Sequence, residues 1–130
     1  RGLLYAKYMS DLKYTDVAPA TSSLDQDFIL NIINYIQENI RETDLNVEKL
    51  AEVFSLSRSQ LYRKIKALTG LTANELIRKI RLERAKELLE QAGQVSVSEV
   101  SYNVGFSSPS YFSKCFKEYF GMLPKEAGEE

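Results

Sequence analysis

The sequence predicts an all-α fold in which two helix-turn-helix subdomains, each a three-helical lobe, are joined by a long central helix. Three observations lead to this fold class. Helix-start patterns recur along the chain, strand-like alternation is nowhere sustained, and a helix-turn-helix pattern occurs twice. The 130 residues suffice for one domain, or for two very small ones that share a core.

The predicted helices begin at residues whose side chains can cap a helix. A Ser or Thr followed three residues later by Glu or Gln satisfies free amides at a helix start, and Asn or Ser caps alone in a similar way. Such starts are Ser23…Gln26, Asn46, Ser57…Gln60, Thr72…Glu75, Ser96…Glu99, and Ser108 before Pro109. We therefore expect helices over residues 24–41, 47–54, 58–69, 73–91, 97–103 and 109–120.

The first 22 residues have the composition of a linker, with the turn-rich stretch KYTDVAPATSS. Because the chain starts without Met, we expect it to be a fragment of a longer protein. Its first dozen residues form either a frayed helix that packs on a missing upstream domain or a disordered stub. We expect one helical domain over residues 23–124 and a tail over 125–130.

An internal repeat fixes the architecture. VEKLAEVFSLS matches VSEVSYNVGFS at an offset of 50, and SRSQLYRKIKALTG matches SPSYFSKCFKEYFG at an offset of 51. Each copy is a helix, a tight turn and a second helix, over residues 46–69 and 96–120. Ser55 and Gly105 occupy the sharp bend in the two copies.

The second helix of each copy has an apolar face and a polar face. In the first copy Leu61, Ile65 and Leu68 face the core, and in the second Phe112, Phe116 and Tyr119 do. Opposite them stand Ser59, Arg63 and Lys66 in the first copy and Ser110, Lys114 and Lys117 in the second. Arg58 and Tyr62 lie on a flank. One such face alone is most simply a solvated charged surface, but two in register favour a shared function.

That shared function is entry into a DNA major groove. Arginine pairs with guanine edges, lysine reaches guanine or phosphate, and serine fits close to either. The net charge of the chain is −1, yet residues 57–86 carry nine Lys or Arg against two Glu. We expect phosphate contacts from Asn46, Lys66, Arg78, Arg81, Ser96, Tyr111 and Lys117.

The central helix, residues 73–91, is apolar on most sides and is expected to bridge the two copies. At 1.5 Å per residue it spans roughly 27 Å, enough to hold two recognition helices about one DNA turn apart. Lys79 with Glu83 and Lys86 with Glu90 have the spacing of helix-supporting pairs. For Arg78, Arg81 and Arg84, phosphate contact and an internal ion pair both remain open.

Enzymatic and metal chemistry is not expected. The chain has no His, no phosphate-cradling glycine loop and one thiol, Cys115, which we interpret as a half-buried helix residue. No metal, cofactor or small-molecule substrate is expected, and no membrane contact. A single Cys excludes an intrachain disulfide, so a cytoplasmic location is expected, within a soluble protein or the cytoplasmic part of a membrane-anchored sensor.

The quoted residues resemble the AraC/XylS-type transcription regulators over about residues 27–124. The resemblance is carried by LAEVFSLSRSQLYRKIKALTG, IRKIRLERAKELL and VSEVSYNVGFSSPSYFSKCFKEYFGMLP. It implies a seven-helix DNA-binding domain with two homeodomain-like lobes and recognition helices in adjacent major grooves. It also implies base contacts by Ser59, Tyr62 and Arg63, and by Ser110, Ser113 and Lys114. To these we add Arg58 from its place on the flank.

The N-terminal part resembles the segment that joins a receiver to an AraC-type domain in hybrid two-component sensors, which implies control of carbohydrate-utilisation genes. RNA polymerase and a second copy, paired through the missing upstream region, are then possible partners. The family continues after Pro124 with an aromatic and a basic residue, whereas this chain has KEAGEE, so a closing helix is doubtful.

A helical protein-interaction module without DNA binding is the alternative. It predicts an apolar groove and an affinity nearly indifferent to salt, whereas DNA binding predicts a steep salt dependence.

Overall fold

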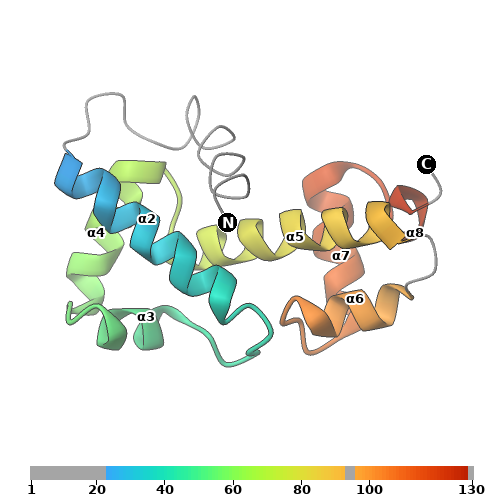
Figure 1. The fold of residues 1–130 in the computed structure, drawn as a ribbon, viewed down its shortest axis with the longest axis horizontal. Helices are drawn as coiled ribbons and strands as arrows, with labels where there is room; N and C mark the ends of the chain where they lie inside the picture. Colours follow the sequence, from blue (N-terminus) through green and yellow to red (C-terminus); the bar gives the residue numbers. More distant parts are fainter. Residues whose placement is uncertain (1–22, 93–95, 129–130) are drawn as a thin grey trace. The chain divides into compact units, whose positions relative to one another are not determined.

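The computed structural model describes residues 23–92 and 96–128, and in this part of the chain it is all-helical, as predicted. Its helices are α2 (Ser23–Glu38), α3 (Val47–Val53), α4 (Arg58–Thr69), α5 (Ala73–Ala92), α6 (Val97–Asn103), α7 (Pro109–Phe120) and α8 (Pro124–Ala127) (Figure 1). The prediction for residues 1–22 lies outside the described residues. The chain forms two compact units. Unit 1 contains the part up to Glu38 and Leu45–Ile77, and unit 2 contains Asn39–Asp44 and the part from Arg78 onward.

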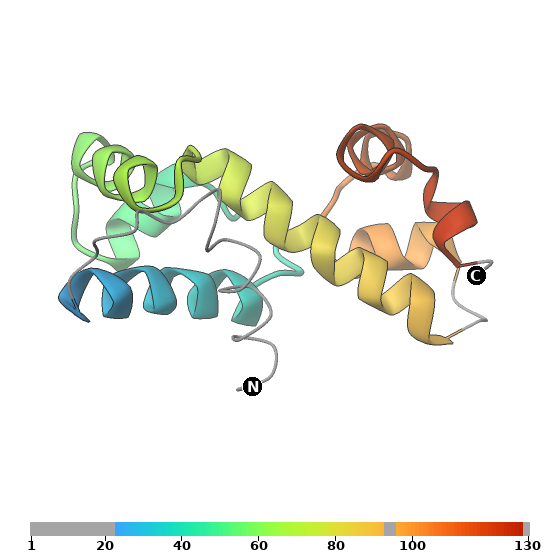
Figure 2. The same ribbon diagram turned by 90° about the horizontal axis from the view of Figure 1, so that it is seen from above.

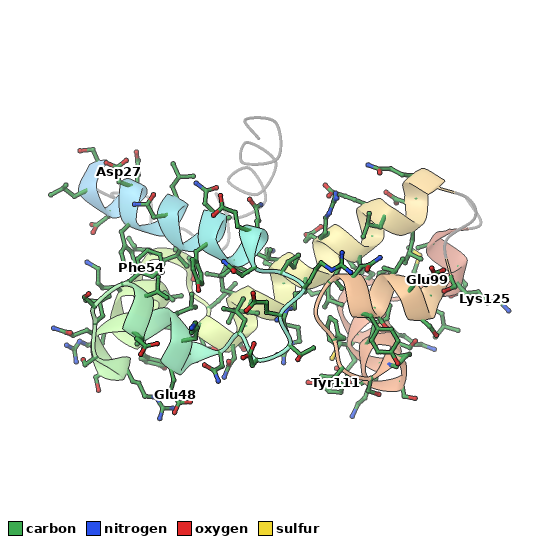
Figure 3. The ribbon with its side chains drawn as sticks, turned by 60° about the horizontal axis from the view of Figure 1, so that its bottom comes forward. Asp27, Glu48, Phe54, Glu99, Tyr111 and Lys125 are labelled. Atoms are coloured by element: carbon green, nitrogen blue, oxygen red, sulfur yellow. The ribbon has the colours of Figure 1, made fainter. Side chains whose placement is uncertain are left out.

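Unit 1 is built from α2, α3, α4 and the first residues of α5. Helix α2 contributes four isoleucines to its core, and α4 contributes the predicted stripe of Leu61, Ile65 and Leu68. Phe54, at the end of α3, packs edge-on against Phe28 and Tyr35 of α2, with ring centroids 6.2 and 6.0 Å apart (Figure 3). Because the stripe of α4 is buried in this core, the opposite face of α4 is exposed to solvent.

The two tight turns predicted from the repeat are present, with the same backbone pattern in each copy. Ser55 has a φ of 56° and Gly105 a φ of 94°, both in the left-handed region. In the first turn Leu56 N–H donates to the Ala51 carbonyl over 2.9 Å, and in the second Phe106 N–H donates to Ser101 over 2.9 Å. The repeat in sequence is therefore a repeat in structure.

Helix α2 ends at Glu38, three residues before the predicted end. The following segment, Asn39–Asp44, leaves the helix axis because Ile40 packs against the core of unit 2 and the Glu42 carbonyl accepts a hydrogen bond from Arg81 there. Helical periodicity continues through Ile40 in the sequence, so periodicity alone does not reveal this exit.

Helix α5 is one continuous helix of 20 residues (Figure 2). Its buried residues occur on most sides, and they are Ala73, Leu76, Ile77, Ile80, Leu82, Ala85 and Leu89. Ala73, Leu76 and Ile77 belong to unit 1, and the residues from Ile80 on belong to unit 2. The expected apolar character of the helix is confirmed.

In the core of unit 2, the burial of two residues of α7 differs from the prediction. Phe112 and Phe116 are buried as expected, but Tyr119 is 42% exposed and Cys115, expected to be half-buried, is 6% exposed. Tyr119 leaves the core because its hydroxyl accepts a hydrogen bond from Lys79 Nζ over 2.8 Å and donates to Glu83 Oε2 over 3.4 Å. Cys115 takes its place in the stripe, three residues after Phe112.

A short closing helix forms after Pro124, although the sequence made it doubtful. Helix α8 covers Pro124–Ala127, Glu126 Oε1 accepts the Leu123 N–H over 2.7 Å, and Ala127 is buried against the core of unit 2. The predicted tail therefore begins inside a helix. None of the described helices is both long and apolar enough to cross a membrane.

Candidate nucleic-acid interface

The first candidate recognition helix, α4, is held at both ends. Ser57 Oγ accepts the Gln60 N–H over 3.1 Å and Gln60 Oε1 accepts the Ser57 N–H over 2.9 Å, the predicted capping box. Gly70, with a φ of 78°, ends the helix by donating its N–H to Lys66. No acidic residue lies in the first turn, so the start of the helix keeps its positive end uncompensated.

The base-contact residues predicted on α4 come together at one place. Arg58, Ser59, Tyr62 and Arg63 are all exposed, and all four line a hollow of about 720 Å³. The ring of Tyr62 is 49% exposed although it is large and apolar. The hollow therefore presents two guanidinium groups, a hydroxyl and a phenol ring on one surface.

The same hollow is lined by residues that the sequence analysis missed: Val47, Thr72, Ala73 and Asn74. The last three reach it because α5 starts directly after the turn at Gly70. There Thr72 Oγ1 accepts the Glu75 N–H over 3.1 Å and Glu75 Oε1 accepts the Thr72 N–H over 2.9 Å. This capping box was predicted. Because it follows Gly70 after only one residue, the sequence could have indicated that the start of α5 lies close to α4.

The second candidate recognition helix, α7, has a similar exposed face. Ser108 Oγ caps it by accepting the Tyr111 N–H over 3.2 Å, and Gly121, with a φ of 77°, ends it as Gly70 ends α4. Ser110 and Lys114 are exposed, and Ser113 is half-buried. Tyr111 is 51% exposed, and its ring centroid lies 6.0 Å from that of Phe106 (Figure 3).

Several predicted phosphate-contact residues have defined partners. Asn46 Oδ1 accepts the Lys49 N–H over 2.9 Å and Ser96 Oγ accepts the Glu99 N–H over 3.0 Å, so both side chains are engaged as helix caps. Lys66 and Lys117 are exposed in the last turns of α4 and α7, at equivalent positions of the repeat. Arg78 is half-buried.

The arginines of α5 separate into different environments. Arg81 donates to the Glu42 carbonyl over 2.6 Å, and burial lowers the pKa of its guanidinium. Arg84 pairs with Glu87 at 3.3 Å and Lys86 with Glu90 at 3.7 Å, the latter as predicted. The contacts of Arg81 and Arg84 in the structure are internal. None of the predicted DNA contacts is tested by the structure, and they stay predictions.

The comparisons with known proteins agree with this geometry. A family model described as a helix-turn-helix domain matches residues 50–129. Histidine kinase P4 of Formosa agariphila is 37% identical over 123 residues, which are 95% of this chain and 9% of that protein. The transcriptional activator RhaS of Escherichia coli strain SE11 is 34% identical over 97 residues, 75% of this chain and 34% of that one.

Solved structures are similar over most of the chain. The C-terminal domain of AraT, a response regulator from Geobacillus stearothermophilus, matches with a TM-score of 0.72 and 33% identity, covering 76% of this chain and 81% of that one. An AraC-type regulator from Chromobacterium violaceum matches with a TM-score of 0.75 and 28% identity, covering 83% and 95%. The DNA-binding domain of AdpA in complex with target DNA matches with 0.71 and 28%, covering 76% and 87%.

A helical domain with two such helix-turn-helix units defines a class of transcription regulators. This chain belongs to the AraC-type helix-turn-helix family of DNA-binding regulators. The resemblance found in the sequence and the predicted two-unit helical fold are thus confirmed. The family acts by binding DNA. Among the described residues no group of His, Cys, Asp or Glu could hold a metal.

Proposed function

We propose that this chain is the output domain of a two-component signalling protein and that it binds double-stranded DNA sequence-specifically. Helices α4 and α7 enter successive major grooves, where Arg63 and Lys114 are the principal base contacts. Arg58, Ser59, Tyr62, Ser110 and Ser113 read neighbouring bases. The observation that carries the proposal is the repeated exposed face, basic and hydroxyl-bearing, on two helices that each begin at a Ser cap, end at a Gly and bury an apolar stripe on the other side.

The two-component assignment is supported by the extent of the similarities. The match to histidine kinase P4 covers 123 of the 130 residues, so it includes at least 15 of the first 22, whereas the match to RhaS covers only 97. The stretch before the helical domain is therefore shared with a kinase. AraT, whose C-terminal domain is similar, is described as a response regulator.

Phosphates are held at the margins of the two faces. Lys66 and Lys117 contact the backbone at the ends of the recognition helices, and Asn46, Ser96, Arg78 and Tyr111 add contacts at helix starts and flanks. The cytoplasm, where bacterial DNA lies, is the proposed site of action. RNA polymerase and a second copy, paired through the upstream region, are proposed partners. Control of carbohydrate-utilisation genes rests on the family resemblance.

Selection from a random duplex library tests the proposal, followed by a salt titration on the recovered duplex. We expect two short sequence blocks about ten base pairs apart. The logarithm of the affinity should fall with the logarithm of the salt concentration, with a slope of about −0.9 for each phosphate contact.

A double variant, Arg63→Ala with Lys114→Ala, should bind the selected duplex more weakly and recover a motif with relaxed preference in both blocks. Lys49→Ala serves as the matched control, because it removes a positive charge from α3, outside the proposed interface, and should recover the same motif. Absence of binding at low salt by the unaltered chain would contradict the proposal and favour a protein-interaction module.

A further inference from the structure

Arg81 turns into unit 2 instead of toward solvent. One terminal nitrogen of its guanidinium donates to the Glu42 carbonyl over 2.6 Å, while its Nε is buried and has no hydrogen-bond partner among the described residues. Taking a guanidinium partly out of water costs free energy unless contacts compensate for it. The position of this side chain therefore implies a contact that outweighs the loss of hydration.

That contact is the turn between α6 and α7. Gly105 is buried there, and a Cβ on it would lie 2.8 Å from Arg81 Nε and 2.9 Å from Cζ, as well as overlapping the Ile40 carbonyl oxygen. The guanidinium and the Ile40 carbonyl therefore rest directly on the backbone of the turn. Only a residue without a side chain leaves room for both.

The first copy of the repeat makes the same turn without this support. Ser55, the equivalent of Gly105, has a φ of 56°, carries a side chain and is exposed. The hydrogen bonds within the two turns are nevertheless equivalent, with Ser55 N–H bonded to Glu52 over 3.2 Å and Gly105 N–H to Tyr102 over 3.1 Å. A helix-turn-helix turn therefore does not itself require an arginine packed on it, and the contact is a particular feature of the second copy.

The second turn is also where a separate segment attaches. Ile40 packs against the core of unit 2, the Ile40 carbonyl lies on Gly105, and the Glu42 carbonyl is bound by Arg81. Helix α7 follows closely, with its cap at Ser108. A shift of this turn would displace the start of α7, and with it Ser110 and Lys114.

We propose that Arg81 is a positioning residue for α7, which it orients by fixing the α6–α7 turn and the segment Asn39–Asp44 against each other. This inference rests on the proposed function, in which α7 reads bases. It assigns Arg81 a role inside the protein in place of the phosphate contact that the sequence left open. The two roles differ in what they require. A phosphate contact needs only a positive charge that reaches the DNA, whereas this role needs a planar guanidinium that packs on Gly105 and donates to the Glu42 carbonyl.

Hydrogen exchange tests the positioning without DNA. In Arg81→Met and Arg81→Lys, the amides of Gly105 and Phe106 should exchange at least about tenfold faster. Their own hydrogen bonds, to Tyr102 and Ser101, remain, but the turn opens more easily once the guanidinium no longer packs on it and binds the Glu42 carbonyl. The matching amides of Ser55 and Leu56 in the first turn should keep their rates. Equal acceleration in both turns would show general destabilisation, and no acceleration in either would show that Arg81 does not hold the turn; both results overturn the inference.

DNA binding gives the second test, on the duplex recovered by selection with the unaltered chain. Both variants should bind about tenfold more weakly with an unchanged salt slope, and should lose base preference only in the block that Lys114→Ala also alters. If Arg81 contacted phosphate, Arg81→Lys would bind nearly normally and Arg81→Met would flatten the slope by about one, which would overturn the inference. If the unaltered chain selects no duplex, the proposed function fails while the exchange rates still decide whether Arg81 holds the turn.

Discussion

Arg63 is the residue on which base reading by the first unit most depends. It is exposed and lines the hollow beside Ser59 and Tyr62. Arg63→Ala should weaken binding to the selected duplex by about 1–3 kcal/mol and relax the preference at one base position. Competition with duplexes substituted one base at a time measures both effects, and equal weakening on every sequence would exclude a base contact.

Lys66 should behave differently, although it is on the same helix. As an exposed phosphate contact in the last turn of α4, it adds affinity without sequence information. Lys66→Ala should weaken binding to all duplexes by a similar factor and flatten the salt slope by about one. A salt titration on two unrelated duplexes shows this, and an effect limited to one of them would assign Lys66 to a base.

Gly105 and Gly121 show two different reasons why a position requires glycine: a positive φ alone, or a positive φ together with a lack of space for a side chain. Both have a positive φ, but a Cβ at Gly105 meets Arg81 and Ile40, whereas a Cβ at Gly121 meets no atom of the described residues within 4 Å. Gly121→Ala should cost only the backbone strain, about 1–2 kcal/mol of unfolding free energy, and Gly105→Ala more than about 3 kcal/mol. Urea denaturation measures both. Equal losses would mean that the packing around Gly105 adjusts.

At the scale of the element, the caps fix where the recognition helices begin. Ser108→Ala removes the acceptor of the Tyr111 N–H and should lower the unfolding free energy by about 1 kcal/mol. Ser107→Ala is the matched control, because Ser107 is exposed one residue before the cap, and it should leave the stability unchanged. If both variants lost the same free energy in urea denaturation, the cap would not be the cause.

The contact between α5 and α7 gives a pH dependence. Burial raises the pKa of the Tyr119 hydroxyl, and the hydrogen bond from Lys79 lowers it in part. A raised pKa favours the neutral phenol in the folded state, so this contribution to stability is complete below the ordinary pKa of 10.0 and is lost as pH rises through the raised pKa. As the pH rises from neutral to above 10.0, the unfolding free energy of Tyr119→Phe should therefore fall less than that of the unaltered chain. Urea denaturation at several pH values in this range measures the difference.

Most helices could be predicted from the sequence because their signals are local. The ranges of α4, α6 and α7 were predicted correctly, since a capping residue, an apolar period and a terminal turn residue mark each of them. Tyr119 was misassigned to the core because helical periodicity places it seven residues after Phe112. Its polar partners, Lys79 and Glu83, lie about 40 positions away on α5, and no local pattern reveals such partners.

Helix α8 could have been predicted from the repeat. Gly121 to Glu126 follow Gly70 to Glu75 at the offset of 51, and the Glu126 carboxylate accepts the Leu123 N–H as Glu75 accepts that of Thr72. The composition of KEAGEE, which has no aromatic residue, does not itself indicate this helix, whereas the repeat does. The part that Thr72 and Asn74 play in the hollow beside α4 was also missed, because these residues lie at the start of α5 and not on the recognition helix itself.

The whole chain carries two DNA-recognition helices, α4 and α7, in one polypeptide. Each described unit contains a helix-turn-helix with its own core, and the chain spans only 9% of histidine kinase P4 and 34% of RhaS. If α4 and α7 each contact bases, each recognition helix should determine the base preference in its own part of the binding site.

Base-by-base preference maps for Arg63→Ala and Lys114→Ala on the selected duplex test this most directly. We expect that each variant relaxes the base preference in one block only, that the two blocks differ, and that they lie about ten base pairs apart. Relaxation of the same block by both variants, or of neither block by one of them, would contradict the claim that α4 and α7 each read DNA.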